Sequence, residues 1–136
     1  MTDNARDEAE ITRLITRLGT ALDEGRIDDL RSIFTADATA TTPGGTAHGR
    51  DRVIAQAARN DEGFTWFQHS ISDILVDLGD DRASVRANPV GVYGRDTAPA
   101  LRVGGLYRFG AVRTPDGRRF DPLAVQPLWQ IENSAA

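Results

Sequence analysis

One of the two histidines of the chain, His69, lies in a stretch of alternating apolar and polar residues, 66–78. A Gly-Asp-Asp turn (79–81) leads to a second alternating stretch, 82–93, so the pair predicts two antiparallel strands. A strand side chain points to one face of its sheet, and histidine has a pKa suited to proton transfer near neutral pH. We therefore expect His69 to carry acid–base chemistry in a pocket.

Composition narrows the chemistry to oxygen and imidazole groups. There is no cysteine, so thiol nucleophiles, disulfides and cysteine-ligated zinc are excluded. All sixteen basic residues are arginine, which excludes lysine chemistry. Two histidines, His48 and His69, are too few for a multi-histidine metal site, and no phosphate-binding glycine loop occurs. We expect aspartate, glutamate, histidine and tyrosine to act without a metal or cofactor.

Helical periodicity marks the first half of the chain. Apolar residues recur at three- and four-residue spacing from Ile11 to Leu22, and Gly25 is expected to end this helix. A shorter helix with Ile27, Leu30, Ile33 and Phe34 on its inner side should follow. Residues 39–42 predict a short strand that stops at the Pro-Gly-Gly of 43–45, and residues 49–60 predict a third helix.

The second half of the chain predicts only strands. Beyond the first pair, residues 100–113 and 118–131 form two more candidate strands around the turn 114–117. Helices followed by antiparallel strands are typical of an α+β domain with helices on one sheet face. With 136 residues and no linker or repeat, the chain is expected to form a single domain over residues 1–136.

Charge and hydropathy restrict the partners. The formal net charge is −4 without basic clusters, which argues against nucleic acid or an anionic membrane as partner. No apolar run approaches a membrane span, and the acidic N-terminal residues differ from a signal peptide. We expect a cytoplasmic protein whose partner is a small molecule.

The ordered set of motifs resembles the SnoaL-like branch of the nuclear-transport-factor-2-like superfamily. The matching residues span nearly the whole chain: Leu22 to Leu30, Phe34 to Ala38, His48 to Asp51, His69, Gly79 to Ala83 and Trp129. The resemblance implies a conical half-barrel, in which three N-terminal helices pack in a curved antiparallel sheet around an apolar pocket. It also implies dimerisation through the sheet.

Relatives in this superfamily include polyketide cyclases, ketosteroid isomerases, scytalone-type dehydratases and limonene-type epoxide hydrolases. The ketosteroid isomerase base falls on Thr42, which cannot act as a base, and the epoxide-hydrolase Arg-x-Asp signature is absent. The scytalone-type comparison implies a pair formed by Asp23 and His69, in which the carboxylate orients the base. The two assisting tyrosines of that enzyme fall on Leu22 and Thr42, so a different substrate is expected.

Further candidates follow from strand position and side-chain type. Tyr93 ends a strand and could donate a hydrogen bond to a developing oxyanion or leaving group. Asp73, four residues after His69, is expected on the same inner face, and Glu132 near the open end could supply a further acid. An apolar pocket would use aromatic side chains to hold a ring system. These candidates for substrate binding are Phe34, Trp66, Tyr107 and Trp129.

These observations favour a cofactor-free cyclase, dehydratase or isomerase that acts on an apolar, oxygenated, polyketide-like secondary metabolite. In this hypothesis His69 is the base, Asp23 orients it and Tyr93 donates a hydrogen bond. The alternative is a non-catalytic ligand-binding or dimerisation module with the same fold. Both predict a homodimer, because the long strands carry apolar residues on both faces.

Overall fold

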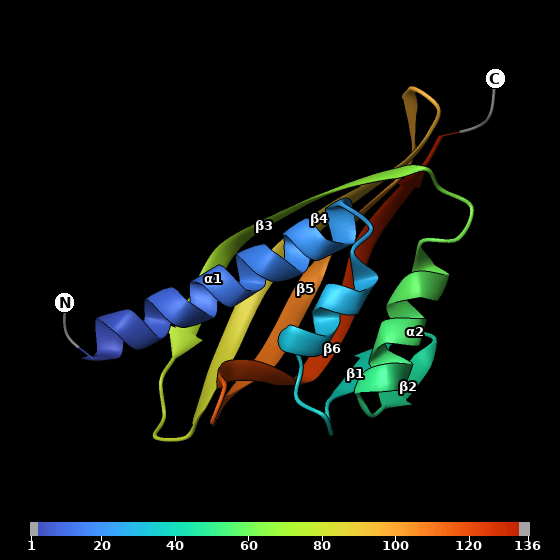
Figure 1. Ribbon diagram of the computed structural model, residues 1–136. Coiled ribbons are helices and arrows are strands. Elements are labelled where there is room, and N and C mark those ends of the chain that lie inside the picture. Colours follow the sequence, from blue (N-terminus) through green and yellow to red (C-terminus); the bar gives the residue numbers. More distant parts are fainter. Residues whose placement is uncertain (1–2, 134–136) are drawn as a thin grey trace.

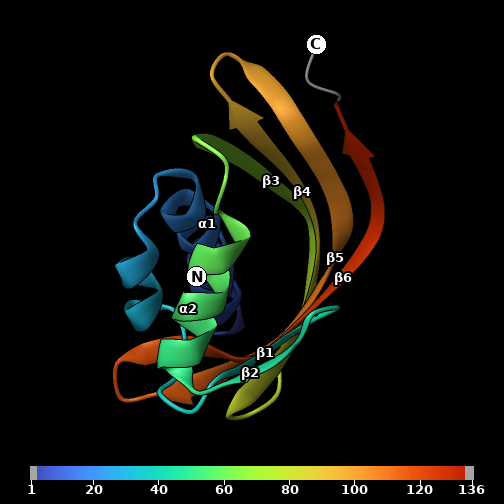
Figure 2. The same cartoon turned by 90° about the vertical axis from the view of Figure 1, so that its right-hand side faces the viewer.

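The computed structural model describes residues 3–133 and forms one curved sheet with helices on its concave face (Figures 1 and 2). The helices are α1 (Asp3–Asp23), the 3₁₀ helix η1 (Ile27–Ser32) and α2 (Arg50–Asn60). The strands are β1 (Thr39–Thr42), β2 (Gly45–His48), β3 (Trp66–Asp77), β4 (Arg82–Arg95), β5 (Ala98–Thr114) and β6 (Gly117–Glu132).

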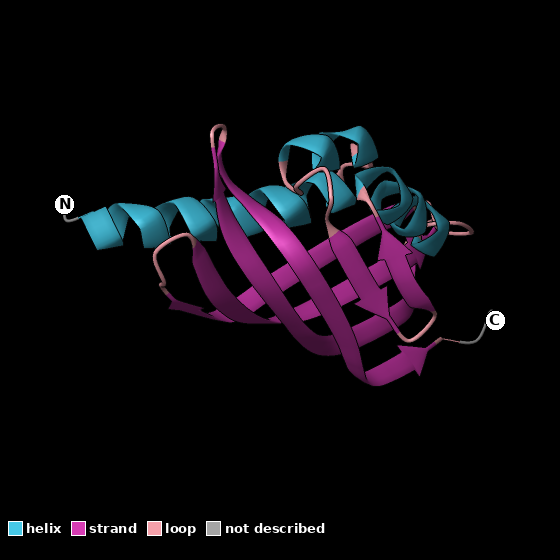
Figure 3. Cartoon of the chain, turned by 90° about the horizontal axis from the view of Figure 1, so that it is seen from below, coloured by secondary structure: helices cyan, strands magenta, loops and turns pink. Residues whose placement is uncertain are grey.

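The six strands lie in the order β2-β1-β6-β5-β4-β3, and the sheet does not close. Long antiparallel strands β3 to β6 form the meander that the sequence predicted. The pairing of β1 with β6 is parallel, so the sheet is mixed rather than wholly antiparallel. With this correction, the expected α+β half-barrel is confirmed. Figure 3 shows α1 running along the length of the sheet.

The predicted helices are present, and one strand escaped prediction. The second helix is a short 3₁₀ helix, and residues 43–44 form a turn after which the chain returns as β2. Residues Thr42 and Gly45 are the last pair of this hairpin. The Pro-Gly-Gly stretch therefore joins two strands, whereas the sequence indicated only the end of one.

The core lies between α1 and the concave sheet face. Ile11, Leu14, Ile15 and Leu18 of α1 are each at most 3% exposed, because their spacing places them on one helix face. They belong to one apolar cluster with residues of the sheet, including Phe109. This packing determines the distance between α1 and the sheet.

Helix α1 ends where the sequence predicted, in a Schellman arrangement around Gly25. The backbone N–H of Arg26 donates to the carbonyl of Ala21 at 2.9 Å, and that of Gly25 donates to Leu22 at 3.3 Å. Gly25 has φ +68°, which L side chains adopt only with strain. The glycine therefore sets Asp23 as the last residue of α1.

A β-bulge in β3 inverts the alternation of the strand. It corrects two expectations, namely that Asp73 lies on the inner face and that both faces of the strand are apolar. The register with β4 shifts between Ser72 and Leu75, and Asp73 has φ +52°. Beyond the bulge, Ile74 and Val76 pack against the same core as Ile71. A bulge adds one residue and so inverts the alternation that follows it. Part of the apparent two-faced apolar character of this strand is therefore an effect of the bulge.

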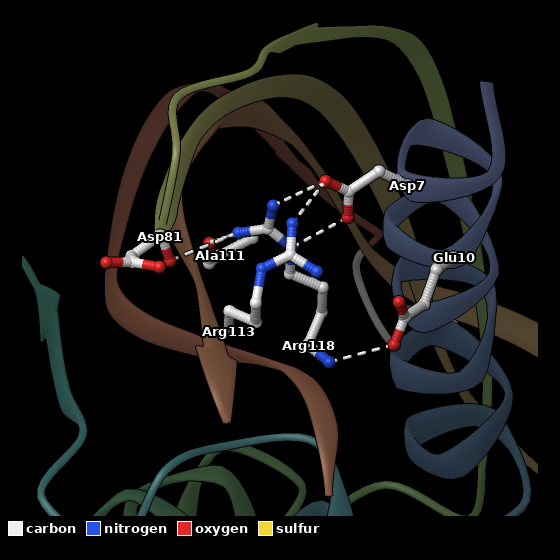
Figure 4. Close-up of polar contacts among 6 residues, drawn as sticks. All are labelled: Asp7, Glu10, Asp81, Ala111, Arg113 and Arg118. Atoms are coloured by element: carbon white, nitrogen blue, oxygen red, sulfur yellow. Dashed lines mark hydrogen bonds and ion pairs between the residues drawn. The ribbon is translucent and has the colours of Figure 1, made fainter. Parts of the chain in front are cut away.

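A buried arginine ties α1 to the far end of the sheet (Figure 4). The guanidinium of Arg118, in β6, donates to both carboxylate oxygens of Asp7, at 2.8 and 2.6 Å, and to the carbonyl oxygen of Ala111 at 2.8 Å. Its side chain is fully buried, and Arg113 adds a bond of 3.0 Å to Asp7. A buried charge needs such pairing, because desolvation is costly. The hydrogen bond from Arg118 lowers the pKa of Asp7.

None of the helices within residues 3–133 combines the length and the apolar character that a membrane-crossing helix needs.

Replacing Asp7 by asparagine should lower the free energy of unfolding by about 3 kcal/mol, because Arg118 would stay buried without its counter-charge. The half-exposed Arg113 provides a control, since R113Q should cost less than about 1 kcal/mol. Denaturant titration measures both values. Because the folded protein lowers the pKa of Asp7, the ionised carboxylate stabilises the fold at pH values above 3.8, the pKa of this group in the unfolded chain. This stabilisation is lost as the pH falls through the pKa of Asp7 in the folded protein. The parent and D7N should therefore converge in acid, and equal losses from both variants would contradict this account.

The convex face of the sheet retains exposed apolar side chains. Val90, Trp129 and Ile131 are 38%, 44% and 50% exposed, and Val90 and Trp129 flank Gly104 in the register. The homodimer packed through this face stays a prediction. Light scattering at micromolar concentration should give twice the chain mass, and I131R should give the monomer mass. A monomeric parent protein would contradict it.

Candidate active site

A cavity of about 130 Å³ opens between the helices and the concave face of the sheet. Its lining is mostly apolar and includes Leu18, Leu22 and Phe34 from the helical side. The polar groups of the lining come from several elements and their connections: Thr42, Gln56, Asn60, Asp61, His69, Tyr93 and Tyr107. An apolar cavity with few convergent polar groups is typical of a small-molecule site.

Asp23 and His69 meet at the edge of this cavity. The ring Nδ1 of His69 lies 2.7 Å from Oδ1 of Asp23, and the backbone N–H of His69 donates to the same oxygen at 2.8 Å. The imidazole is 5% exposed and the carboxylate 27% exposed. The end of α1 therefore holds both the backbone and the ring of one residue of β3.

This geometry fixes the tautomer of the neutral imidazole. An ionised carboxylate only accepts hydrogen bonds, so Nδ1 of His69 carries the hydrogen that points at Asp23. The second nitrogen, Nε2, then bears a lone pair. Because the structure gives Nε2 no hydrogen-bond partner among residues 3–133 and His69 lines the cavity, Nε2 is available to a bound molecule. Carboxylate-oriented histidines of this kind act as general bases in enzymes.

The strand opposite His69 makes room for its ring. Gly91 is the register partner of His69 in β4. A Cβ at position 91 would lie 3.2 Å from Nε2 of His69 and 3.1 Å from the ring of Tyr93. Glycine at this position therefore lets both side chains lie close to the backbone of β4.

Tyr93 lies beside His69 within an aromatic cluster. Its ring makes edge contacts with His69 at 5.7 Å, with Phe67 at 5.6 Å and with Phe64 at 5.2 Å between centroids. Burial raises the pKa of Tyr93 to about 12, and the negative charges of Asp61 and Asp23 add to this effect. Burial also raises the pKa of Tyr107. Both phenols therefore stay neutral at physiological pH and can donate hydrogen bonds.

Four residues predicted for the pocket lie outside its lining, and strand phase explains two of them. Asp73 sits at the β3 bulge, where it is exposed and accepts a hydrogen bond from Asn88 at 3.2 Å. Phe67 and His69 face inward, so Trp66 takes the opposite face, where its indole N–H donates to the carbonyl of Asp96 at 3.0 Å.

The other two belong to β6. The indole of Trp129 lies across Gly104, where a Cβ would collide with it, and remains 44% exposed. The register of β5 with β6 shifts just after Gly104, so alternation along the strand did not reveal this placement. Glu132 is exposed at the end of β6 and accepts a hydrogen bond from Gln130. Phe34 and Tyr107 line the cavity, and their role in substrate binding stays a prediction.

Sequence reasoning missed Asp61, which lines the cavity just after α2. Burial raises the pKa of its carboxyl, and the charge of His69 partly opposes this shift. Asn60, Asp61 and Glu62 precede Gly63 and have the composition of a surface turn, so no sequence signal separated Asp61 from its neighbours. Within residues 3–133, no three histidine or carboxylate side chains gather into a candidate metal site.

Comparisons with known proteins agree with this architecture. The chain matches the SnoaL-like domain family over residues 3–132. An uncharacterized protein of Mycobacterium tuberculosis is 35% identical over 118 residues, which are 83% of this chain and 80% of the relative.

Solved structures match nearly the whole chain. A candidate scytalone dehydratase of Novosphingobium aromaticivorans superposes with a TM-score of 0.87 at 21% identity, covering 100% of this chain and 94% of its own. A hexachlorocyclohexane dehydrochlorinase of Novosphingobium barchaimii gives a TM-score of 0.82 at 16% identity, covering 98% and 94%. At these identities the likeness establishes the fold alone.

Proposed function

The chain belongs to the SnoaL-like domain family, and we propose that it is a cofactor-free dehydratase of small, single-ring β-hydroxy carbonyl compounds. The observation that carries this proposal is the double hydrogen bond from His69, a residue of the cavity lining, to Oδ1 of Asp23, which leaves Nε2 without a partner among the described residues. Cyclisation and isomerisation would begin with the same proton abstraction. Elimination is favoured because the two structurally similar proteins are named for loss of water and of hydrogen chloride.

The size of the cavity supports a single-ring substrate. The volume is about 130 Å³, and an engineered apolar cavity of about 150 Å³ holds benzene. A six-membered ring that carries one or two oxygen atoms is of this size, whereas a fused polyketide ring system is larger. The apolar lining, with Leu18 and Phe34, suits the hydrocarbon part of such a ring.

Residues of the candidate site supply a base, a counter-charge for that base and a hydrogen-bond donor for the carbonyl oxygen. Nε2 of His69 takes the proton from the carbon beside the carbonyl, and the imidazolium that forms is stabilised by Asp23 at 2.7 Å. Negative charge develops on the carbonyl oxygen during this step. Tyr93, which stays neutral because burial raises its pKa to about 12, donates a hydrogen bond to that oxygen.

Dehydration of 3-hydroxycyclohexanone to cyclohex-2-enone, followed by the ultraviolet absorbance of the enone, tests the proposal. The substitution H69Q should lower kcat/KM by about 10²- to 10⁴-fold, because it removes the base. It should leave the thermal midpoint nearly unchanged, since glutamine keeps the backbone N–H that binds Asp23.

The matched control is H48Q, since His48 is exposed at the end of β2, and this variant should keep the parent rate. Full activity of H69Q would contradict the assigned base. A parent protein that binds cyclohexanones without turnover would instead favour the non-catalytic ligand-binding module.

A further inference from the structure

Asp61 is held over the cavity by contacts of its own segment. Its backbone N–H donates to the carbonyl of Ala58 at 3.2 Å, so it follows directly on the last turn of α2. The next residues are fixed to β4, since the backbone N–H of Thr65 donates to Gly94 at 2.8 Å and the Arg95 side chain donates to Gly63 at 2.6 Å. Hydrogen bonds on both sides of Asp61 in the chain thus determine its position in the cavity lining.

The carboxyl of Asp61 makes no contact within residues 3–133 that would indicate a structural role. Among residues 3–133, no group hydrogen-bonds to it or forms an ion pair with it. Its place after a helix C-terminus is electrostatically unfavourable for a negative charge. Asp7, by contrast, has two arginine partners. A partly buried acid without partners is costly, which indicates a function in the site.

Asp61 shares the lining of the cavity with the groups of the proposed reaction. They are His69 from β3, with Asp23 of α1 behind it, Tyr93 from β4 and Tyr107 from β5. The charge of His69 lowers the pKa of Asp61, and the charge of Asp61 raises that of Tyr93. Because burial favours the neutral form, the carboxyl keeps its proton to a higher pH than an exposed aspartate does.

We propose that Asp61 is the general acid of this site, which protonates the leaving hydroxyl while His69 removes the carbon-bound proton. The inference rests on the proposed dehydratase function. The C–H electron pair forms the new C=C bond, and the C–O bond breaks with its electron pair on oxygen. That oxygen takes the Asp61 proton and departs as water. The reaction leaves a His69 imidazolium and an Asp61 carboxylate, and a proton transferred between them through water restores the starting state.

A comparison of two leaving groups tests this role. Hydroxide needs a proton to depart, whereas chloride does not, so D61N should slow dehydration of 3-hydroxycyclohexanone by about 10²- to 10⁴-fold. It should slow loss of chloride from 3-chlorocyclohexanone less than about threefold, measured above the buffer rate. H69Q should slow both reactions, because both need the base. The matched control is D73N, which removes the same charge from an exposed site outside the cavity and should change neither rate.

Other outcomes separate this inference from the proposed function. Equal loss of both reactions in D61N, or loss of neither, would overturn the role of Asp61 as acid while the His69 mechanism stands. Absence of both reactions in the parent would overturn the proposed function and this inference with it. The thermal midpoint of D61N at pH 7 should equal or exceed that of the parent, since asparagine carries no charge to desolvate. A lower midpoint would indicate a structural role and contradict the proposal.

Discussion

A single carboxylate oxygen, Oδ1 of Asp23, accepts two hydrogen bonds from His69, and the geometry of the candidate site depends on it. One bond holds the strand backbone and the other holds the imidazole ring, at 2.8 and 2.7 Å. A buried N–H without a partner costs about 1–3 kcal/mol. The same interaction therefore joins α1 to β3 and determines which ring nitrogen keeps its lone pair, so stability and chemistry share one contact.

The rest of the fold keeps that contact in place. Near its start, α1 is tied to β6 by the buried pair of Asp7 and Arg118. At its other end, the turn at Gly25 sets the last helical residue. The apolar face of α1 packs on the curved sheet between these two points. Two fixed ends leave the helix little freedom to slide, and a site that must hold atoms within about 0.5 Å needs such support.

Periodicity was sufficient to predict the helices and the long strands, but it did not predict β2 or the irregularities of the strands. The stripe from Ile11 to Leu22 gave α1, and alternation gave the strands of the meander. One extra residue at the β3 bulge inverts the phase, so Asp73 leaves the inner face that simple alternation assigned to it. The position of Trp129 outside the cavity depends on a register shift between β5 and β6. The parallel pairing of β1 with β6 joins segments that are far apart in the sequence. Asp61 lies in a turn-like segment, and only the three-dimensional course of that segment between α2 and β4 reveals its burial.

The central claim is that Asp23 holds His69 with the hydrogen on Nδ1 and the lone pair on Nε2. Nitrogen-15 NMR of the imidazole rings at neutral pH measures this tautomer without a substrate. We expect the His69 signals of the neutral ring to show a protonated Nδ1 and an unprotonated Nε2, and D23N to weaken that preference because the charged acceptor is lost. The same analysis of His48, which does not contact Asp23, provides the internal reference. A neutral His69 ring with the hydrogen on Nε2 would contradict the account, because its only lone pair would then point at Asp23.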